Sequence, residues 1–135
     1  MTSTDSLGAA AQRRTRQRTA ITELLAGATE FCTAQELHAR LREAGENVGL
    51  ATVYRALQAM ADAGELDVIR NLEGQAAYRN CSTDHHHHHL ICRSCGKTVE
   101  VSAPDFEAWA KSVAAEHGFA EIEHSLELFG RCGSC

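Results

Sequence analysis

Two cysteine pairs near the C-terminus carry the clearest chemical signal in the sequence. Cys92 and Cys95 form one Cys-x-x-Cys turn, and Cys132 and Cys135 form a second. Each turn directs two thiolates at one ion, and two such turns complete a tetrahedral Zn²⁺ site. Because four sulfur ligands leave no open coordination position, the predicted zinc is structural. The alternative is a pair of redox dithiols, although nothing around them resembles a thioredoxin βαβ unit.

A run of histidines at residues 85–89 supplies further metal ligands. Successive side chains of a strand point to opposite faces. We therefore expect His87 and His89 on one face and His86 and His88 on the other, so that one strand serves two ions. The alternatives are a purification tag and a low-complexity metal-collecting tract. However, the run is internal and leads directly into a predicted strand.

Two ligand sets follow from this alternation. The first combines residues around the predicted hairpin with one face of the strand: Asp67, Cys81, His87 and His89. Its mixture of sulfur, nitrogen and oxygen donors suits Zn²⁺. The second takes the other face: His86, His88, Glu107 and His124. A solvated carboxylate remains the alternative for Asp67, and a core histidine for His124. With the four-cysteine site, up to three Zn²⁺ ions per protomer are predicted.

Basic residues in the first half of the chain indicate a nucleic-acid partner. Four arginines lie in a stretch that has no acid between Asp5 and Glu23, namely Arg13, Arg14, Arg16 and Arg18. Tyr54 and Arg55 occupy the start of a predicted helix, where recognition helices meet base edges. We predict DNA contacts from Tyr54, Arg55, Arg16 and Arg18. The alternatives are a solvated N-terminal arm and an exposed arginine beside a half-buried tyrosine.

The apolar periodicity predicts the elements that must position these residues. Helices over 15–26, 33–44 and 51–63 precede strands over 66–70 and 75–79, which is the order of a winged helix-turn-helix. Thr33 and Glu36 match a capping box at the start of the second helix. Beyond residue 80 we expect strands over 86–91 and 98–101, a helix from Pro104 to about residue 117, and an alternating segment over 120–130.

The predicted class is therefore α+β. A winged-helix DNA-binding domain over residues 1–80 is followed over 81–135 by a small α/β metal-binding dimerisation domain with a three-stranded antiparallel sheet. Each half is small for a self-sufficient core, so a metal or a dimer interface is expected to stabilise it.

Composition narrows the class of protein. The chain has 135 residues, six cysteines and a formal net charge of −5, which argues against indiscriminate binding to nucleic acid. No apolar stretch is long enough for a membrane span and no secretory signal is visible, so we expect a cytoplasmic protein. A Ser/His/Asp constellation, a Gly-rich phosphate loop and an HExxH motif are all missing from the sequence, and we therefore do not expect an enzyme.

The motifs together resemble the ferric uptake regulator (Fur) family over residues 13–135. The resemblance is carried by Gln35-Glu36-Leu37-His38, by the segment from Gly49 to Leu57, by the histidine run leading into Cys92-x-x-Cys95-Gly96, and by Cys132-x-x-Cys135. Within the family the chain is most similar to the zinc uptake regulators of actinobacteria.

The resemblance implies a homodimeric repressor that binds operator DNA when loaded with zinc and controls zinc-uptake genes. It assigns the four cysteines to a structural zinc, the Asp67 set to a sensing site at the hinge between domains, and the Glu107 set to an additional regulatory site. The alternatives are an iron- or peroxide-sensing regulator of the same family and a zinc-buffering protein.

Overall fold

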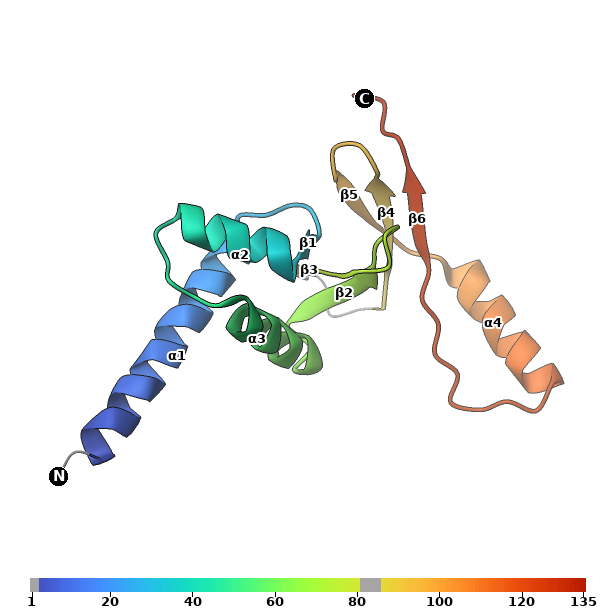
Figure 1. Ribbon diagram of the computed structural model, residues 1–135. Helices are drawn as coiled ribbons and strands as arrows, with labels where there is room; N and C mark the ends of the chain where they lie inside the picture. The colour runs from blue at the N-terminus through green and yellow to red at the C-terminus, as the bar shows by residue number, and fades with distance from the viewer. Residues whose placement is uncertain (1–2, 81–85) are drawn as a thin grey trace. The chain divides into compact units, whose positions relative to one another are not determined.

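The computed structural model describes residues 3–80 and 86–135, which form two compact units, Met1–Ser82 and Thr83–Cys135 (Figure 1). The first unit contains helices α1 (Ser3–Ala26), α2 (Ala34–Glu43) and α3 (Leu50–Asp62) with strands β1 (Cys32–Thr33), β2 (Leu66–Arg70) and β3 (Ala76–Asn80). The second contains β4 (His88–Cys92), β5 (Thr98–Val101), α4 (Pro104–Glu116) and β6 (Glu127–Gly130). No helix in the described ranges is both long and apolar enough to cross a membrane.

Helix α1 begins twelve residues before the predicted start at residue 15. The apolar stripe that marks a packed helix begins only at Ile21, so periodicity could not reveal the earlier turns. Residues 9–12 are three alanines and a glutamine, which favour helix without any packing. The first turns of α1 therefore extend from the packed body of the unit on local propensity.

Helices α2 and α3 begin and end close to the predicted residues. Thr33 caps α2, because its hydroxyl oxygen accepts a hydrogen bond from the Glu36 N–H at 3.2 Å. Gly45 after α2 and Gly64 after α3 have φ of 83° and 77°. In both cases the following N–H bonds back to the helix, Glu46 to Leu41 O and Glu65 to Met60 O, which is the Schellman pattern.

The core of the first unit lies between the three helices and the small sheet. It is formed by the buried side chains Ile21, Leu25, Ala34, Leu37, Leu41, Val48, Val53, Leu57, Met60, Leu66 and Tyr78. The sheet has the order β1-β3-β2 with antiparallel neighbours, and β2 and β3 form the wing. This arrangement buries one side of α3 and leaves the other side exposed. The winged helix-turn-helix predicted from the sequence is confirmed.

The sheet of the second unit has three strands in the order β5-β4-β6, as Figure 1 shows. Strand β5 is antiparallel to β4, but β6 is parallel to it, with Cys92 opposite Gly130. The prediction of an antiparallel sheet was therefore wrong. Helix α4 and the segment after it form a crossover that returns the chain to the free edge of β4 in the same direction.

The alternating segment predicted over 120–130 is a strand only from Glu127 onward. Glu121 has φ of 55°, which interrupts extended backbone. Alternation of apolar and polar residues therefore overestimated the length of this strand. The shorter strand leaves His124 in the segment that leads into β6.

Candidate metal centres and nucleic-acid interface

Four cysteine sulfurs converge at one end of the second sheet. The Sγ atoms of Cys92 and Cys135 lie 3.9 Å apart, those of Cys95 and Cys132 3.7 Å, and those of Cys132 and Cys135 3.6 Å. Four sulfurs at the usual Zn–S distance of about 2.3 Å are about 3.8 Å from one another in a tetrahedron. The separations fit one zinc ion, and they are far too long for disulfides.

Strand direction explains why the two Cys-x-x-Cys turns meet. Cys92 ends β4 and Cys132 follows the end of β6. Because these strands are parallel, their carboxyl ends lie at the same edge of the sheet. An antiparallel β6 would have placed Cys132 at the opposite end of β4.

The cysteine cluster also contains hydrogen-bond donors for a thiolate. The backbone N–H of Cys132 donates to Cys92 Sγ at 3.3 Å. This donor, followed by the backbone N–H of Cys95, lowers the pKa of the Cys92 thiol to about 5. The neighbouring sulfurs of Cys132 and Cys95 instead raise the pKa of Cys135. A divalent cation favours the thiolate form of every ligand, so this group of sulfurs is suited to metal binding.

A second cluster lies at the other end of β4 and on α4. The Glu107 Oε1 atom is 2.6 Å from His88 Nε2 and 2.9 Å from the Nε2 atoms of both His86 and His124. The His86 and His124 Nε2 atoms lie 3.0 Å apart. Three imidazole nitrogens and one carboxylate oxygen thus surround a single point, and this donor set suits zinc.

Glu107 is held in its charged form. Partial burial opposes ionisation, but hydrogen bonds from His88 and His124 outweigh it and hold the pKa of Glu107 below its usual value. Phe106 packs edge-on against His88 and His124, with ring centroids 5.9 Å and 5.3 Å away. The phenyl ring thus packs against two of the clustered imidazoles.

The remaining histidines of the run lie together, as the alternation predicted. The rings of His87 and His89 are 4.8 Å apart, whereas the His86 ring is 4.8 Å from that of His88. Glu100 on β5 pairs with His89 in the strand register, and its Oε1 atom is 4.0 Å from His87 Nε2. The sequence analysis did not single out Glu100. The sequence signal that could have done so is an acidic residue on the strand predicted to follow the histidine run.

The residues of the predicted hinge set come from separate parts of the chain. Asp67 lies half-buried on β2 of the first unit, and His87 and His89 belong to the second. Cys81 lies outside the described residues, as does His85. The set therefore remains a prediction.

Tyr54 and Arg55 are both exposed on α3, and Tyr54 retains 50% of its side-chain exposure. The opposite side of the helix packs into the core through Val53, Leu57 and Met60. The polar side of α3 is thus free to meet another molecule.

The two arginines of α1 that are predicted to contact DNA have acidic neighbours. Arg18 donates two hydrogen bonds to the Glu65 carboxylate, at 2.8 Å and 2.9 Å. Arg16 lies 4.0 Å from Glu46 and its side chain is 80% exposed. The pair of Arg18 and Glu65 joins α1 to the turn after α3. DNA contacts by Arg16 and Arg18 stay predictions.

The chain combines a winged helix with a small domain in which cysteines and histidines cluster. These features together define the class of protein, which is a metal-binding regulator of transcription. The chain belongs to the ferric uptake regulator family, whose model matches residues 9–129. The family predicted from the sequence is thereby confirmed. Because this is a family of DNA-binding regulators, the expectation that the chain is not an enzyme is confirmed as well.

Individual relatives refine this assignment. The chain is 53% identical to the zinc uptake regulation protein of Mycobacterium tuberculosis over 129 residues, which cover 96% of this chain and 98% of the relative. Its structure is similar to the crystal structure of FurB from M. tuberculosis, a zinc uptake regulator, with 52% identity, a TM-score of 0.58 and coverage of 95% and 98%. A zinc uptake regulator complexed with zinc and DNA matches with 28% identity, a TM-score of 0.72 and coverage of 100% and 96%.

Proposed function

We propose that this protein is a zinc-responsive transcriptional repressor, which binds operator DNA as a homodimer when loaded with zinc and controls zinc-uptake genes. The observation that carries the proposal is the combination of a recognition helix with exposed Tyr54 and Arg55 and a cysteine cluster whose sulfur separations suit zinc. Near full-length similarity to a mycobacterial zinc uptake regulation protein supports it. A repressor acts at the chromosome, so a cytoplasmic location is part of the proposal.

The four-cysteine cluster is proposed to hold a structural zinc. Cys92, Cys95, Cys132 and Cys135 offer four sulfurs and no open position, so a bound ion there would join the end of β4 to the end of the chain. Such an ion stabilises a domain that is too small to rely on its own core.

The Glu107 cluster is proposed as a regulatory zinc site. His86 lies just before β4, His88 lies on β4 and Glu107 lies on α4. His124 lies in the segment leading to β6. An ion bound to all of them would join three parts of the second unit. Its occupancy would therefore act on the packing of α4.

The sensing site is proposed on sequence grounds as Asp67, Cys81, His87 and His89. A thiolate in the set favours zinc over magnesium, calcium or manganese, and over iron(II). Ligands from both halves of the chain would let zinc binding fix the orientation of two recognition helices in a dimer. Their spacing must match one turn of DNA, about 34–36 Å.

The homodimer is supported by apolar surface that the protomer does not cover. Leu90, Val99 and Leu128 are cross-strand neighbours and remain 43%, 44% and 50% exposed. Helix α4 has no buried residue, and its Trp109 is 60% exposed. A second copy of the chain would remove this surface from water.

The proposal is tested by DNA binding at buffered free zinc. A duplex selected from a randomised pool with the zinc-loaded protein serves as the probe, and bound zinc per protomer is measured in parallel. We expect specific binding that requires zinc and disappears with chelator. High zinc content without sequence-specific binding would instead indicate a zinc-buffering protein, and activation by iron(II) but not zinc would indicate an iron sensor.

The variant Cys81→Ser tests the sensing site in the same assay. We expect it to lose zinc-dependent DNA binding while it keeps the zinc of the four-cysteine cluster. Cys32→Ala is the control, because Cys32 is a buried cysteine of the first unit that belongs to none of the proposed ligand sets. Full zinc-dependent binding by Cys81→Ser would show that the sensing site is misassigned.

A further inference from the structure

Arg79 lies on β3, close in sequence to Cys81 of the proposed sensing site. Its Nε atom donates a hydrogen bond to the Thr29 carbonyl oxygen at 3.0 Å. Thr29 belongs to the loop over residues 27–31, which joins α1 to β1. This bond anchors the guanidinium beside the wing and connects the strand that leads to Cys81 with the helical part of the first unit.

The strand register places an acidic residue next to this guanidinium. Asp67 on β2 is the direct antiparallel partner of Arg79. Directly opposed residues point to the same face of a sheet, with Cβ atoms about 4.5–5.5 Å apart. Both side chains are half-buried, so solvent screens this pair of charges less than it screens a fully exposed pair. The acid opposite Arg79 is thus the carboxylate proposed as a ligand of the sensing zinc.

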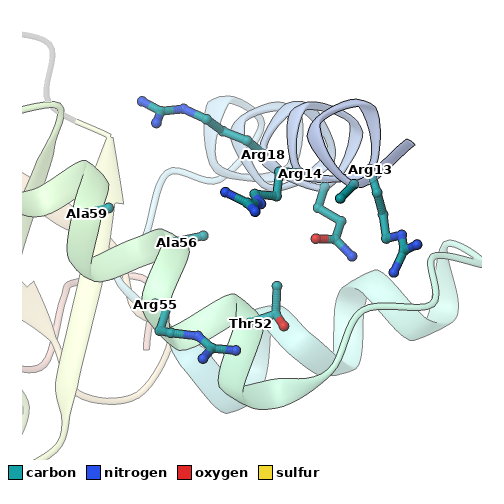
Figure 2. A pocket seen from close by; sticks show the side chains of 9 residues that line it. Arg13, Arg14, Arg18, Thr52, Arg55, Ala56 and Ala59 are labelled. Carbon is teal, nitrogen blue, oxygen red and sulfur yellow. The ribbon is translucent and has the colours of Figure 1, made fainter. Parts of the chain in front are cut away.

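Other arginines of the first unit have different surroundings. Arg70 lies on the same hairpin and also donates to a backbone carbonyl, Gly74 O at 3.0 Å, but its cross-strand partner is Ala76. Of the two arginines on the described strands β2 and β3, only Arg79 is paired with a proposed ligand. Four more arginines line a groove of about 600 Å³ between α1 and α3, as Figure 2 shows, namely Arg13, Arg14, Arg18 and Arg55.

We propose that Arg79 is a positioning residue of the sensing site, which orients the Asp67 carboxylate for zinc without touching the metal. The inference rests on the proposed sensing site and adds a residue to it. Carboxylates that bind metals are themselves held by hydrogen bonds from outer residues. Arginine has five N–H donors in a planar fork, so one side chain can bond the Thr29 carbonyl and a carboxylate together.

This role differs from that of an ordinary ion pair. Loss of an outer hydrogen-bond partner lowers metal affinity about 10–100-fold. An ion pair that serves only the hairpin would leave zinc affinity unchanged and would have little effect on stability. Moreover, Arg79 acts through Asp67, so its effect must disappear once Asp67 is removed. Such dependence appears as non-additivity in a double-mutant cycle.

The test measures zinc affinity by competition with a chromophoric chelator. The full chain carries Glu107→Ala, which removes the other histidine site and leaves the sensing site to be measured. We expect Arg79→Ala to lower zinc affinity about 10–100-fold while it keeps the zinc of the four-cysteine cluster. Asp67→Ala should lower the affinity at least as much, and the double variant should match Asp67→Ala alone.

Two further variants complete the experiment. Arg70→Ala is the matched control, since Arg70 makes a similar backbone bond on the same hairpin opposite an alanine, and it should leave zinc affinity unchanged. Arg79→Lys keeps the charge, which guards against loss of folding. It should recover only part of the affinity, because an ammonium lacks the planar fork.

Unchanged affinity in Arg79→Ala, full affinity in Arg79→Lys, or losses that add in the double variant would overturn the positioning role. Unchanged affinity in Asp67→Ala would instead overturn the proposed sensing site. The two failures are therefore distinguishable within one set of titrations.

Discussion

Tyr78 shows how a single buried atom can limit stability. Its side chain is completely buried in the core of the first unit, and its hydroxyl has no hydrogen-bond partner among the described residues. Burial accordingly raises the pKa of this phenol. A buried hydroxyl without a partner carries a desolvation cost of about 1–3 kcal/mol.

We predict that Tyr78→Phe leaves the free energy of unfolding unchanged or raises it by about 1 kcal/mol, because the ring stays packed and the unpartnered oxygen is removed. Urea denaturation of the full chain measures the effect. Tyr54→Phe, at an exposed position, is the control. A loss of more than about 1 kcal/mol in Tyr78→Phe would mean that the hydroxyl makes a favourable bond in solution.

The local surroundings of each cysteine shift the pKa of its thiol in different directions. Burial raises the pKa of Cys32, which keeps it a neutral thiol, whereas N–H donors lower the pKa of Cys92. We predict that Cys95→Ser removes one zinc ion per protomer and lowers the thermal stability of the second unit, since three ligands bind zinc more weakly than four. Metal analysis with a melting curve measures both.

Cys32→Ala should keep the full zinc content in that experiment. Equal zinc content in Cys95→Ser and the wild-type protein would contradict the four-cysteine assignment. The two variants thus separate a ligand cysteine from a packing cysteine.

At the scale of elements, the ends of α2 and α3 depend on two glycines in the left-handed region. The backbone at Gly64 has φ of 77°, and a Cβ built there meets no atom within 4 Å. A side chain at this position is therefore opposed by backbone conformation and not by crowding. The turn it forms leads directly to Glu65, the partner of Arg18 on α1.

We predict that Gly64→Ala lowers the free energy of unfolding by about 1–2 kcal/mol, the usual cost of a left-handed L-residue. Gly64→Asn should cost less, because asparagine tolerates this conformation. Chemical denaturation of both variants gives the comparison. Equal losses would show that the cost arises from a contact and not from the backbone.

At the scale of the whole molecule, the second unit is incomplete as a single copy. The stripe of Leu90, Val99 and Leu128 crosses all three strands and remains exposed. We predict that Val99→Lys shifts the protein from dimer to monomer, because a lysine in an apolar interface must be desolvated. Sedimentation velocity measures the shift.

Val68→Lys is the matched control, since Val68 is a similarly exposed valine, at 45%, on the wing of the first unit. It should leave the oligomeric state unchanged. A dimer that survives Val99→Lys would place the interface elsewhere on the chain.

Local sequence patterns determined the helices of the first unit and the faces on which the histidines lie. The capping residues, the glycine stops and the stripe of Val53, Leu57 and Met60 predicted α2 and α3, because each signal lies within one or two helical turns. The alternation of the histidine run also predicted the pairing of His87 with His89 and of His86 with His88, since a strand has a period of two.

Tertiary structure decided the direction of β6 and the neighbours of the arginines on α1. Strand direction is set by the crossover through α4, so only the fold placed Cys132 beside Cys92 at one end of a parallel pair. The neighbours of each arginine on α1 likewise come from residues distant in sequence. Glu65 and Glu46 approach Arg18 and Arg16 through packing of the helices, while Arg13 and Arg14 face an open groove. Contacts of this kind depend on where elements meet, and no local pattern encodes that.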